Sequence, residues 1–108
     1  MKRLAIIGSG DLGQLIAYHA INSKKYEFVG FFDDFKTSQT TVGLGKILGK
    51  TTEIESIFNR KLFDVLLIGI GYNHINFRKK IFENFVQKIP FAKLIHKSCH
   101  VDASAIIG

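Results

Sequence analysis

A glycine-rich motif near the N-terminus has the residue types and spacing of a phosphate-binding turn. The pattern is G-x-G-x-x-G, and it consists of Gly8, Ser9, Gly10, Asp11, Leu12 and Gly13. Gly8 would permit a tight turn, Gly10 would let a pyrophosphate approach the backbone, and Gly13 would let a helix pack closely on a strand. The motif follows an apolar run and opens a helical pattern, as dinucleotide-binding motifs require. The first N–H groups of that helix would favour an anion.

Charged residues follow the second apolar run, where a ribose or base would meet the predicted sheet. Asp33 lies twenty residues after Gly13, which is the spacing typical of an acidic side chain that recognises ribose. For Asp34, nucleoside recognition and a polar turn are equally good interpretations, and Lys36 would lie near phosphate. The carboxylate of Asp11 would repel phosphate, but a helix-capping role would direct it toward backbone N–H groups instead.

A second glycine-containing turn ends the third apolar run. Gly71, Tyr72 and Asn73 would lie at the same edge of the sheet as the glycine motif, so the two turns could line one ligand cleft. Tyr72 could stack on a base or simply cover the end of a strand. Asn73 is equally well explained as the cap of the following helix.

The cysteine and histidine content and the length of the apolar runs argue against disulfide-stabilised, zinc-binding and membrane-spanning proteins. The single cysteine, Cys99, excludes an internal disulfide and is compatible with a reducing cytoplasm. His96 and His100 flank it, but without a carboxylate or a second cysteine they make a poor zinc site, so we expect no metal. The longest apolar run has six residues, far below the roughly 20 that span a membrane.

The net charge of +6 favours an anionic partner, either a nucleotide or a nucleic acid. Nucleic-acid binding would require a basic stripe with interleaved exposed aromatic residues. The basic run Arg78-Lys79-Lys80 is more typical of a solvated helix face. We therefore expect no nucleic-acid partner and rank a regulatory or nucleic-acid-binding module as a distant third interpretation.

Strands and helices must alternate to position these turns. Apolar runs over 4–7, 27–32 and 65–70 predict buried strands, and shorter strands are expected near 46–48 and over 91–95. Helical patterns lie between them. This alternation predicts an α/β fold with a Rossmann-like open parallel sheet in the spatial order 3-2-1-4-5. The segment 36–50 is otherwise expected to be a loop.

The helical patterns also predict which residues are buried and how the helices begin and end. The first helix should start with a capping box of Asp11 and Gln14, and the second with one of Thr52 and Glu55. The inner face of the first helix should hold Leu12, Leu15, Ile16, His19 and Ala20. The third helix should end at Pro90, with an inner face of Ile75, Phe82, Phe85, Val86 and Ile89.

The last residues of the chain change character. Val101-Asp102 and Ile107-Gly108 are six positions apart, which is the spacing of hexapeptide repeats in β-helices. We predict a Rossmann-like domain over residues 1–96, followed over 97–108 by a linker and the first hexapeptide coil. A β-helix needs several such coils, and 108 residues is short for a complete enzyme of this pattern.

Several segments in this order resemble the bacterial sugar O- and N-acyltransferases, which include sialic acid O-acetyltransferases and UDP-4-amino-sugar N-acetyltransferases. The matching segments are Lys2-Arg3-Leu4-Ala5-Ile6-Ile7-Gly8-Ser9-Gly10, Gly30-Phe31-Phe32-Asp33-Asp34, Ile70-Gly71-Tyr72-Asn73, Arg78-Lys79-Lys80-Ile81-Phe82 and Leu94-Ile95-His96-Lys97-Ser98. Asp11 and Leu12 depart from the family, which often has Gly and His there, and Lys97 replaces a usual Pro.

The resemblance implies that this domain holds the nucleotide of a UDP- or GDP-linked amino sugar. Its glycine turn would contact the pyrophosphate, and Asp33 and Asp34 the nucleoside. A left-handed β-helix would follow, form a homotrimer and bind acetyl-CoA between subunits. The general-base histidine would lie in that β-helix, so no residue here is expected to be catalytic, and His96 and His100 do not inherit that role. Because the β-helix would set the trimer, the isolated chain is compatible with a monomer.

An NAD(P)-dependent oxidoreductase is the second interpretation. The glycine motif and Asp33 fit its dinucleotide-binding domain equally well. The two interpretations differ at the C-terminus, because an oxidoreductase has no reason to carry a hexapeptide repeat there.

Overall fold

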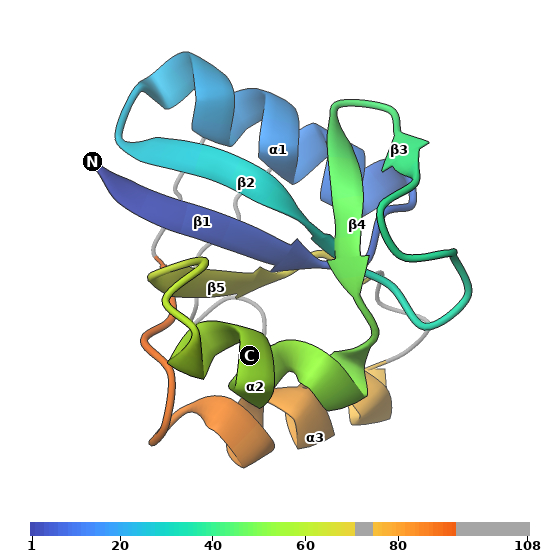
Figure 1. Cartoon of the computed structure of the whole chain (residues 1–108), viewed down its shortest axis with the longest axis vertical. Coiled ribbons are helices and arrows are strands. Elements are labelled where there is room, and N and C mark those ends of the chain that lie inside the picture. Colours follow the sequence, from blue (N-terminus) through green and yellow to red (C-terminus); the bar gives the residue numbers. More distant parts are fainter. Residues whose placement is uncertain (71–74, 93–108) are drawn as a thin grey trace.

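The computed structural model describes residues 1–70 and 75–92 as a sheet with helices on both faces (Figure 1). Helix α1 covers one face of the sheet, and α2 and α3 lie on the other. In chain order the elements are β1 (Lys2–Ile7), α1 (Asp11–Ser23), β2 (Tyr26–Phe32), β3 (Thr41–Val42), β4 (Gly45–Gly49), a 3-10 helix (Thr51–Glu53), α2 (Ile54–Asn59), β5 (Val65–Ile68) and α3 (Ile75–Phe85).

The sheet has the strand order β3-β4-β2-β1-β5. All neighbouring pairs are parallel except β3 and β4. A parallel bridge between Leu66 and Phe91 extends the sheet beyond β5. Counted without the antiparallel β3, which was not predicted, these strands follow the predicted order 3-2-1-4-5, and the prediction of an α/β fold with an open parallel sheet is confirmed for them. All four residues of β5 and the last four of β1 are buried, as strands in a sheet covered on both faces require.

The segment between β2 and α2 contains more structure than a loop with one short strand. Gly45–Gly49 forms β4, and Thr41–Val42 pairs with it as the antiparallel strand β3. Gly43 makes the turn between the two strands with a φ of 57°, in the left-handed region that favours glycine. The sequence indicated β4 but not β3, because a strand of two residues is too short to show a periodic pattern of apolar residues.

The buried face of α1 differs from the predicted one. Its buried residues are Gly13, Ile16, Ala17 and Ala20, whereas Leu15 is 42% exposed and His19 is half-buried. The prediction of Leu15 in the core was therefore wrong. The buried residues follow the same three-four spacing counted from Gly13 rather than from Leu12, because Gly13 packs directly on the glycine turn, and this rotation of the helix leaves Leu15 facing outward.

The ends of the helices also differ from the predictions. Gly10 is the N-cap of α1 and no side chain caps it, so Asp11 and Gln14 form no capping box. The 3-10 helix begins with one half of such a capping exchange, at Lys50 and Glu53 rather than at Thr52 and Glu55: the Lys50 N–H donates to Glu53 Oε2 at 2.7 Å. Helix α3 ends at Phe85, not Pro90, because the chain turns there through hydrogen bonds from the N–H groups of residues 88 and 89 to the Phe85 carbonyl.

The core beneath α3 was predicted in part. Ile89 is buried and Phe82 and Phe85 are half-buried, as predicted. Val86, however, is 41% exposed, and Ile81, which was not predicted to face inward, is buried. The side chain of Ile75 and the predicted strand residues 93–95 lie outside the described part. So do Cys99, both neighbouring histidines and the whole of 97–108, where the hexapeptide coil is expected.

Candidate functional site

The glycine turn joins β1 to α1 through close backbone contacts. Gly8 adopts a φ of 97°, and its N–H donates to the Phe32 carbonyl at the end of β2 at 2.7 Å. A Cβ on Gly13 would lie 2.0 Å from the Gly8 carbonyl oxygen, and one on Gly69 would lie 2.8 Å from the Cα of Gly13. Side chains at these positions are therefore excluded by the fold itself, which brings the turn, α1 and the end of β5 together.

Gly10 differs from these neighbours because the fold does not require a glycine there. Apart from its neighbours in the chain and the backbone of its own helix, no atom of residues 1–70 and 75–92 lies within 4 Å of the position that its Cβ would occupy. Its backbone is extended, with φ −77° and ψ −163°, a conformation open to any residue. The bare backbone at Gly10 therefore leaves free space at the N-terminus of α1, where a helix favours anions.

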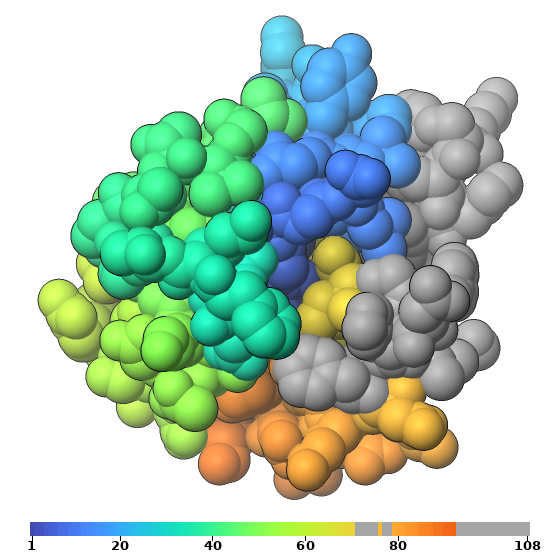
Figure 2. All heavy atoms as spheres, turned by 90° about the vertical axis from the view of Figure 1, so that its right-hand side faces the viewer, coloured from blue at the N-terminus to red at the C-terminus, as the bar shows by residue number. Residues whose placement is uncertain are grey.

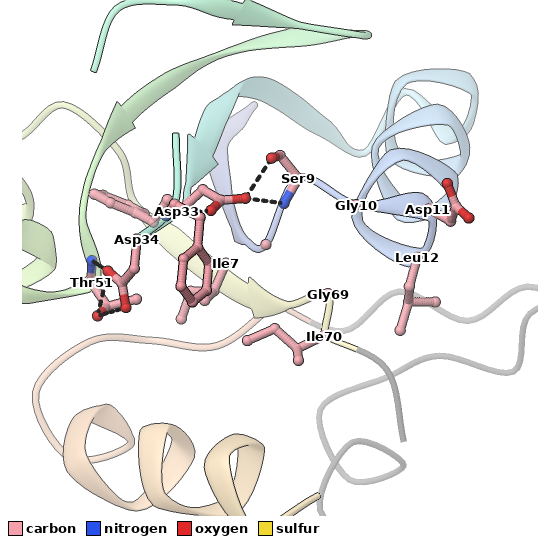
Figure 3. Close-up of a pocket in the computed structure, with 13 residues that line it drawn as sticks. Ile7, Ser9, Gly10, Asp11, Leu12, Asp33, Asp34, Thr51, Gly69 and Ile70 are labelled. Carbon is pink, nitrogen blue, oxygen red and sulfur yellow. Dashed lines mark hydrogen bonds between the residues drawn. The ribbon is translucent and has the colours of Figure 1, made fainter. Parts of the chain in front are cut away.

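Ser9 and Asp33 connect the glycine turn to the end of β2 (Figure 3). Ser9 is buried, and both its hydroxyl and its N–H donate to Asp33 Oδ2, at 2.6 and 3.2 Å. The N–H of Phe35 donates to Asp33 Oδ1 at 2.9 Å. Partial burial raises the pKa of Asp33, but the hydrogen bonds from Ser9 and Phe35 and the charge of Lys36 outweigh it and hold the pKa below its usual value.

Asp33 is therefore an ionised acceptor at the carboxyl end of β2. A carboxylate has about four lone-pair sites, and the three N–H and O–H donors above occupy three of them. The remaining capacity suits one further donor, such as a hydroxyl group of a ligand.

Asp34 turns to the other side of the same strand end and binds Thr51. Its Oδ1 accepts a hydrogen bond from the Thr51 N–H at 2.8 Å, and the threonine hydroxyl lies 3.0 Å from each carboxylate oxygen. This pair ties the end of β2 to the start of the 3-10 helix. Sequence reasoning missed Thr51, although the predicted strand near 46–48 placed it just beyond the carboxyl end of a parallel strand, where ligands of such sheets bind.

A pocket of about 720 Å³ lies at the carboxyl ends of the parallel strands. Figure 2 looks onto this side, where the blue glycine turn, the teal segment after β2 and the yellow end of β5 surround a hollow. Its walls are mostly apolar, with the carboxylates of Asp33 and Asp34 among few polar groups. The lining residues are Ile7, Gly8, Ser9, Gly10, Asp11, Leu12, Phe32, Asp33, Asp34, Phe35, Thr51, Gly69 and Ile70.

The structure brings most of the predicted site residues together. Gly8 to Leu12, Asp33 and Asp34 line the pocket, whereas Gly13 packs behind the turn and Lys36 is not among the lining residues. Gly71, Tyr72 and Asn73 lie outside the described residues. The pocket residues that sequence reasoning missed include Thr51, Phe35 and the apolar floor at Ile7 and Phe32, which had been interpreted only as strand residues.

The structure also explains the polar side chains of Asp11, in the glycine motif, and of Gln14, directly after it. The exposed carboxylate of Asp11 points away from Asp33 and Asp34, so it does not face the centre of the polar pocket wall. The side-chain amide of Gln14 donates to the carbonyls of Ser9 and Val42, at 3.1 and 3.0 Å, and accepts from the Leu44 N–H at 2.9 Å. Gln14 thus ties the β3–β4 hairpin to the glycine turn.

Residues 1–70 and 75–92 contain no group of three or more His, Cys, Asp or Glu side chains that could hold a metal ion. None of the helices in this part of the chain is long and apolar enough to cross a membrane.

Several solved structures are similar to this chain. The acetyltransferase domain of PglB from Neisseria gonorrhoeae shares 27% identity with a TM-score of 0.74, over 90% of this chain and 45% of that one. The same domain in complex with acetyl coenzyme A matches at 28% identity and a TM-score of 0.71, over 89% and 44%. This chain therefore spans less than half the length of that domain.

Two more distant structures share the fold. One is a perosamine N-acetyltransferase variant from Caulobacter crescentus in complex with CoA and GDP-perosamine, at 16% identity and a TM-score of 0.69, over 91% of this chain and 44% of that one. The other is UDP-D-quinovosamine 4-dehydrogenase from Vibrio fischeri, at 21% identity and 0.69, over 82% and 73%.

Comparison by sequence gives two results. Curated protein sequences include no match to this chain. The family model of the PglD N-terminal domain matches residues 3–85, which include the glycine turn, both aspartates and every described strand and helix from β2 to α3. Because that model covers most of the chain, the protein belongs to the PglD N-terminal domain family.

Proposed function

We propose that this chain is the nucleotide-sugar-binding part of an acetyl-CoA-dependent sugar acetyltransferase that acts on a UDP- or GDP-linked amino sugar. The observation that carries the proposal is the pocket at the carboxyl ends of the parallel strands, built around the glycine turn, in a member of the PglD N-terminal domain family. The size of this pocket is within the usual range for small-molecule sites.

Each side of the pocket suits one part of such a ligand. The open backbone at Gly10 and the N-terminus of α1 suit the pyrophosphate, with Ser9 held beside them by Asp33. The remaining acceptor capacity of Asp33 suits a ribose hydroxyl, and Asp34 lies next to it for the nucleoside. In this proposal Lys36 lies near the phosphate groups. The second turn, with Gly71, Tyr72 and Asn73, also helps to line the ligand cleft.

The chemistry of acetyl transfer would reside in the rest of the protein. This chain matches less than half of the gonococcal acetyltransferase domain, so we propose that acetyl-CoA binds outside it, in a left-handed β-helix that follows the Rossmann-like domain of residues 1–96. Residues 97–108 would begin that β-helix. We further propose that the whole protein is a cytoplasmic homotrimer with its general-base histidine in the β-helix.

A dinucleotide-binding role is the second candidate. The fold is shared with a dehydrogenase from Vibrio fischeri, and Asp33 occupies the place at which NAD-binding domains recognise ribose. NAD and a nucleotide sugar both contain a ribose and a pyrophosphate, so both fit the acceptor at Asp33 and the open backbone at Gly10.

Calorimetric titration of the chain with UDP, GDP and NADH separates the two candidates. We expect UDP or GDP to bind and NADH to bind more weakly or not at all. Adding the corresponding nucleotide-linked sugar should preserve binding, and no acetyl transfer from acetyl-CoA should occur. Binding of NADH without binding of UDP, GDP or their sugars would overturn the proposal in favour of the dinucleotide-binding role.

A further inference from the structure

Phe35 is exposed to an unusual degree for an aromatic side chain beside a pocket. Its side chain is 93% exposed, whereas the next most exposed aromatic residue in the described part is Tyr18 at 54%. Phe35 also lines the pocket, immediately after the two aspartates at the end of β2. A phenylalanine in water leaves its whole apolar surface unburied, so a partner that covers the ring would gain from contact with it.

The backbone that carries Phe35 is held in place rather than loose. The Phe35 N–H donates to Asp33 Oδ1 at 2.9 Å, and the preceding residue, Asp34, is tied to Thr51. The ring is therefore presented from an anchored strand end, next to the carboxylate that has capacity for a ribose hydroxyl. A base attached to a ribose at Asp33 would extend from the sugar within reach of a side chain two residues further along the chain.

We propose that Phe35 is the stacking surface for the base of the bound nucleotide. This inference rests on the proposed function and adds the part of the ligand that the carboxylates do not cover. Aromatic side chains stack on the faces of nucleic-acid bases with little dependence on base identity, because every base has a π-face. Phe35 would thus separate nucleotides from phosphate compounds that lack a base, and it would accept a uracil or a guanine.

The test compares UDP, GDP and inorganic pyrophosphate as ligands of the 108-residue chain, of three variants at Phe35 and of one control variant. Phe35→Ala removes the ring, Phe35→Leu keeps an apolar side chain without a π-face, and Phe35→Tyr keeps the π-face. Leu62→Ala is the matched control, because Leu62 is also an exposed apolar residue and does not line the pocket. Thermal melting verifies that each variant folds, and NMR follows the Phe35 ring protons when UDP or GDP is added.

Stacking predicts that Phe35→Ala and Phe35→Leu weaken binding of the nucleotide by about 5- to 150-fold. Pyrophosphate affinity should stay unchanged, Phe35→Tyr and Leu62→Ala should bind like the unmodified chain, and the Phe35 ring signals should shift on binding. Equal nucleotide affinity in Phe35→Ala, or an equal loss for pyrophosphate, would overturn the role of Phe35 alone. If the unmodified chain binds neither UDP nor GDP, the proposed function fails and this inference fails with it.

Discussion

The hydroxyl of Ser9 donates a hydrogen bond of 2.6 Å to Oδ2 of Asp33, a residue 24 positions further along the chain. This bond joins the glycine turn after β1 to the acidic end of β2, two loops that meet because the strands are parallel neighbours. The glycine motif and the acidic residue at its characteristic spacing are therefore directly connected. Asp33 has a positioning role as well as a proposed ligand-binding role.

Replacing Ser9 with alanine should destabilise the protein in a pH-dependent way. The hydrogen bonds lower the pKa of Asp33, so their stabilisation is fully present above the ordinary value of 3.8 and is lost as the pH falls through the lower folded-state value. We expect Ser9→Ala to lose about 1 kcal/mol at pH 7 and less at pH 2.5, measured by urea unfolding. NMR titration should show a higher pKa for Asp33.

Ser23→Ala is the matched control for that experiment. The Ser23 hydroxyl bonds only locally, to the Ala20 carbonyl and from the Lys25 N–H. Its removal should have a small effect that is the same at both pH values. An equal loss of stability for Ser9→Ala at pH 7 and pH 2.5 would contradict the assigned role of the Ser9 hydroxyl.

Replacing Gly13 with alanine should strongly destabilise the fold, although alanine normally stabilises a helix relative to glycine by about 1 kcal/mol. The added Cβ would lie 2.0 Å from the Gly8 carbonyl oxygen, so α1 must move away from the turn. We expect a loss of about 3 kcal/mol or more, measured by thermal or urea unfolding. Gly10→Ala is the control and should change stability by less than about 1 kcal/mol. Equal stability of the two variants would contradict this packing.

Replacing Gly10 with valine should separate ligand binding from folding. The extended backbone of Gly10 and the open space around its missing Cβ allow a branched side chain at the loss of about 1 kcal/mol for a poorer helix cap. The same side chain would fill the space into which the proposed pyrophosphate approaches. Calorimetry should therefore show at least a tenfold loss of affinity for UDP or GDP in a protein that still melts cooperatively. Unchanged affinity would place the phosphate groups elsewhere.

Replacing Gln14 should loosen the β3–β4 hairpin. Gln14→Ala removes all three hydrogen bonds of the side-chain amide, which we expect to lower stability by about 1–2 kcal/mol. Hydrogen exchange should speed up at the Leu44 N–H, which donates to Gln14 Oε1. In Gln14→Glu this acceptor is retained while the donations to Ser9 and Val42 are lost, so the Leu44 N–H should stay partly protected. Unchanged exchange in Gln14→Ala would show that the hairpin is held by other contacts.

Much of the fold and part of the site could be predicted because the signals are local. Apolar runs without polar alternation identified the buried strands β1, β2 and β5. Glycines at fixed spacing identified a turn that needs a positive φ at Gly8 and a bare backbone at Gly13. These are backbone and burial requirements that each segment meets by itself, so they are readable without knowing its neighbours.

Features that depend on contacts between distant segments were not predictable in the same way. The buried face of α1 excludes Leu15 because the packing of Gly13 on the glycine turn and on the end of β5 orients the helix with Gly13, Ile16, Ala17 and Ala20 inward. Gln14 binds the β3–β4 hairpin as well as the glycine turn, and Asp34 binds Thr51. Each of these contacts depends on where a distant segment lies in the fold, and the sequence around the residue does not specify that position.

The sequence by itself therefore determined the alternation of strands and helices, the glycine turn and the presence of acidic residues after β2. Only the tertiary structure decided how those residues are used, because parallel pairing of β1, β2 and β4 brings their carboxyl ends to one edge. At that edge Asp33 receives hydrogen bonds from Ser9, Asp34 binds Thr51, and Phe35 is left exposed at the pocket. The hydrogen-bond partners and the exposure of these side chains therefore depend on segments that are distant in the sequence.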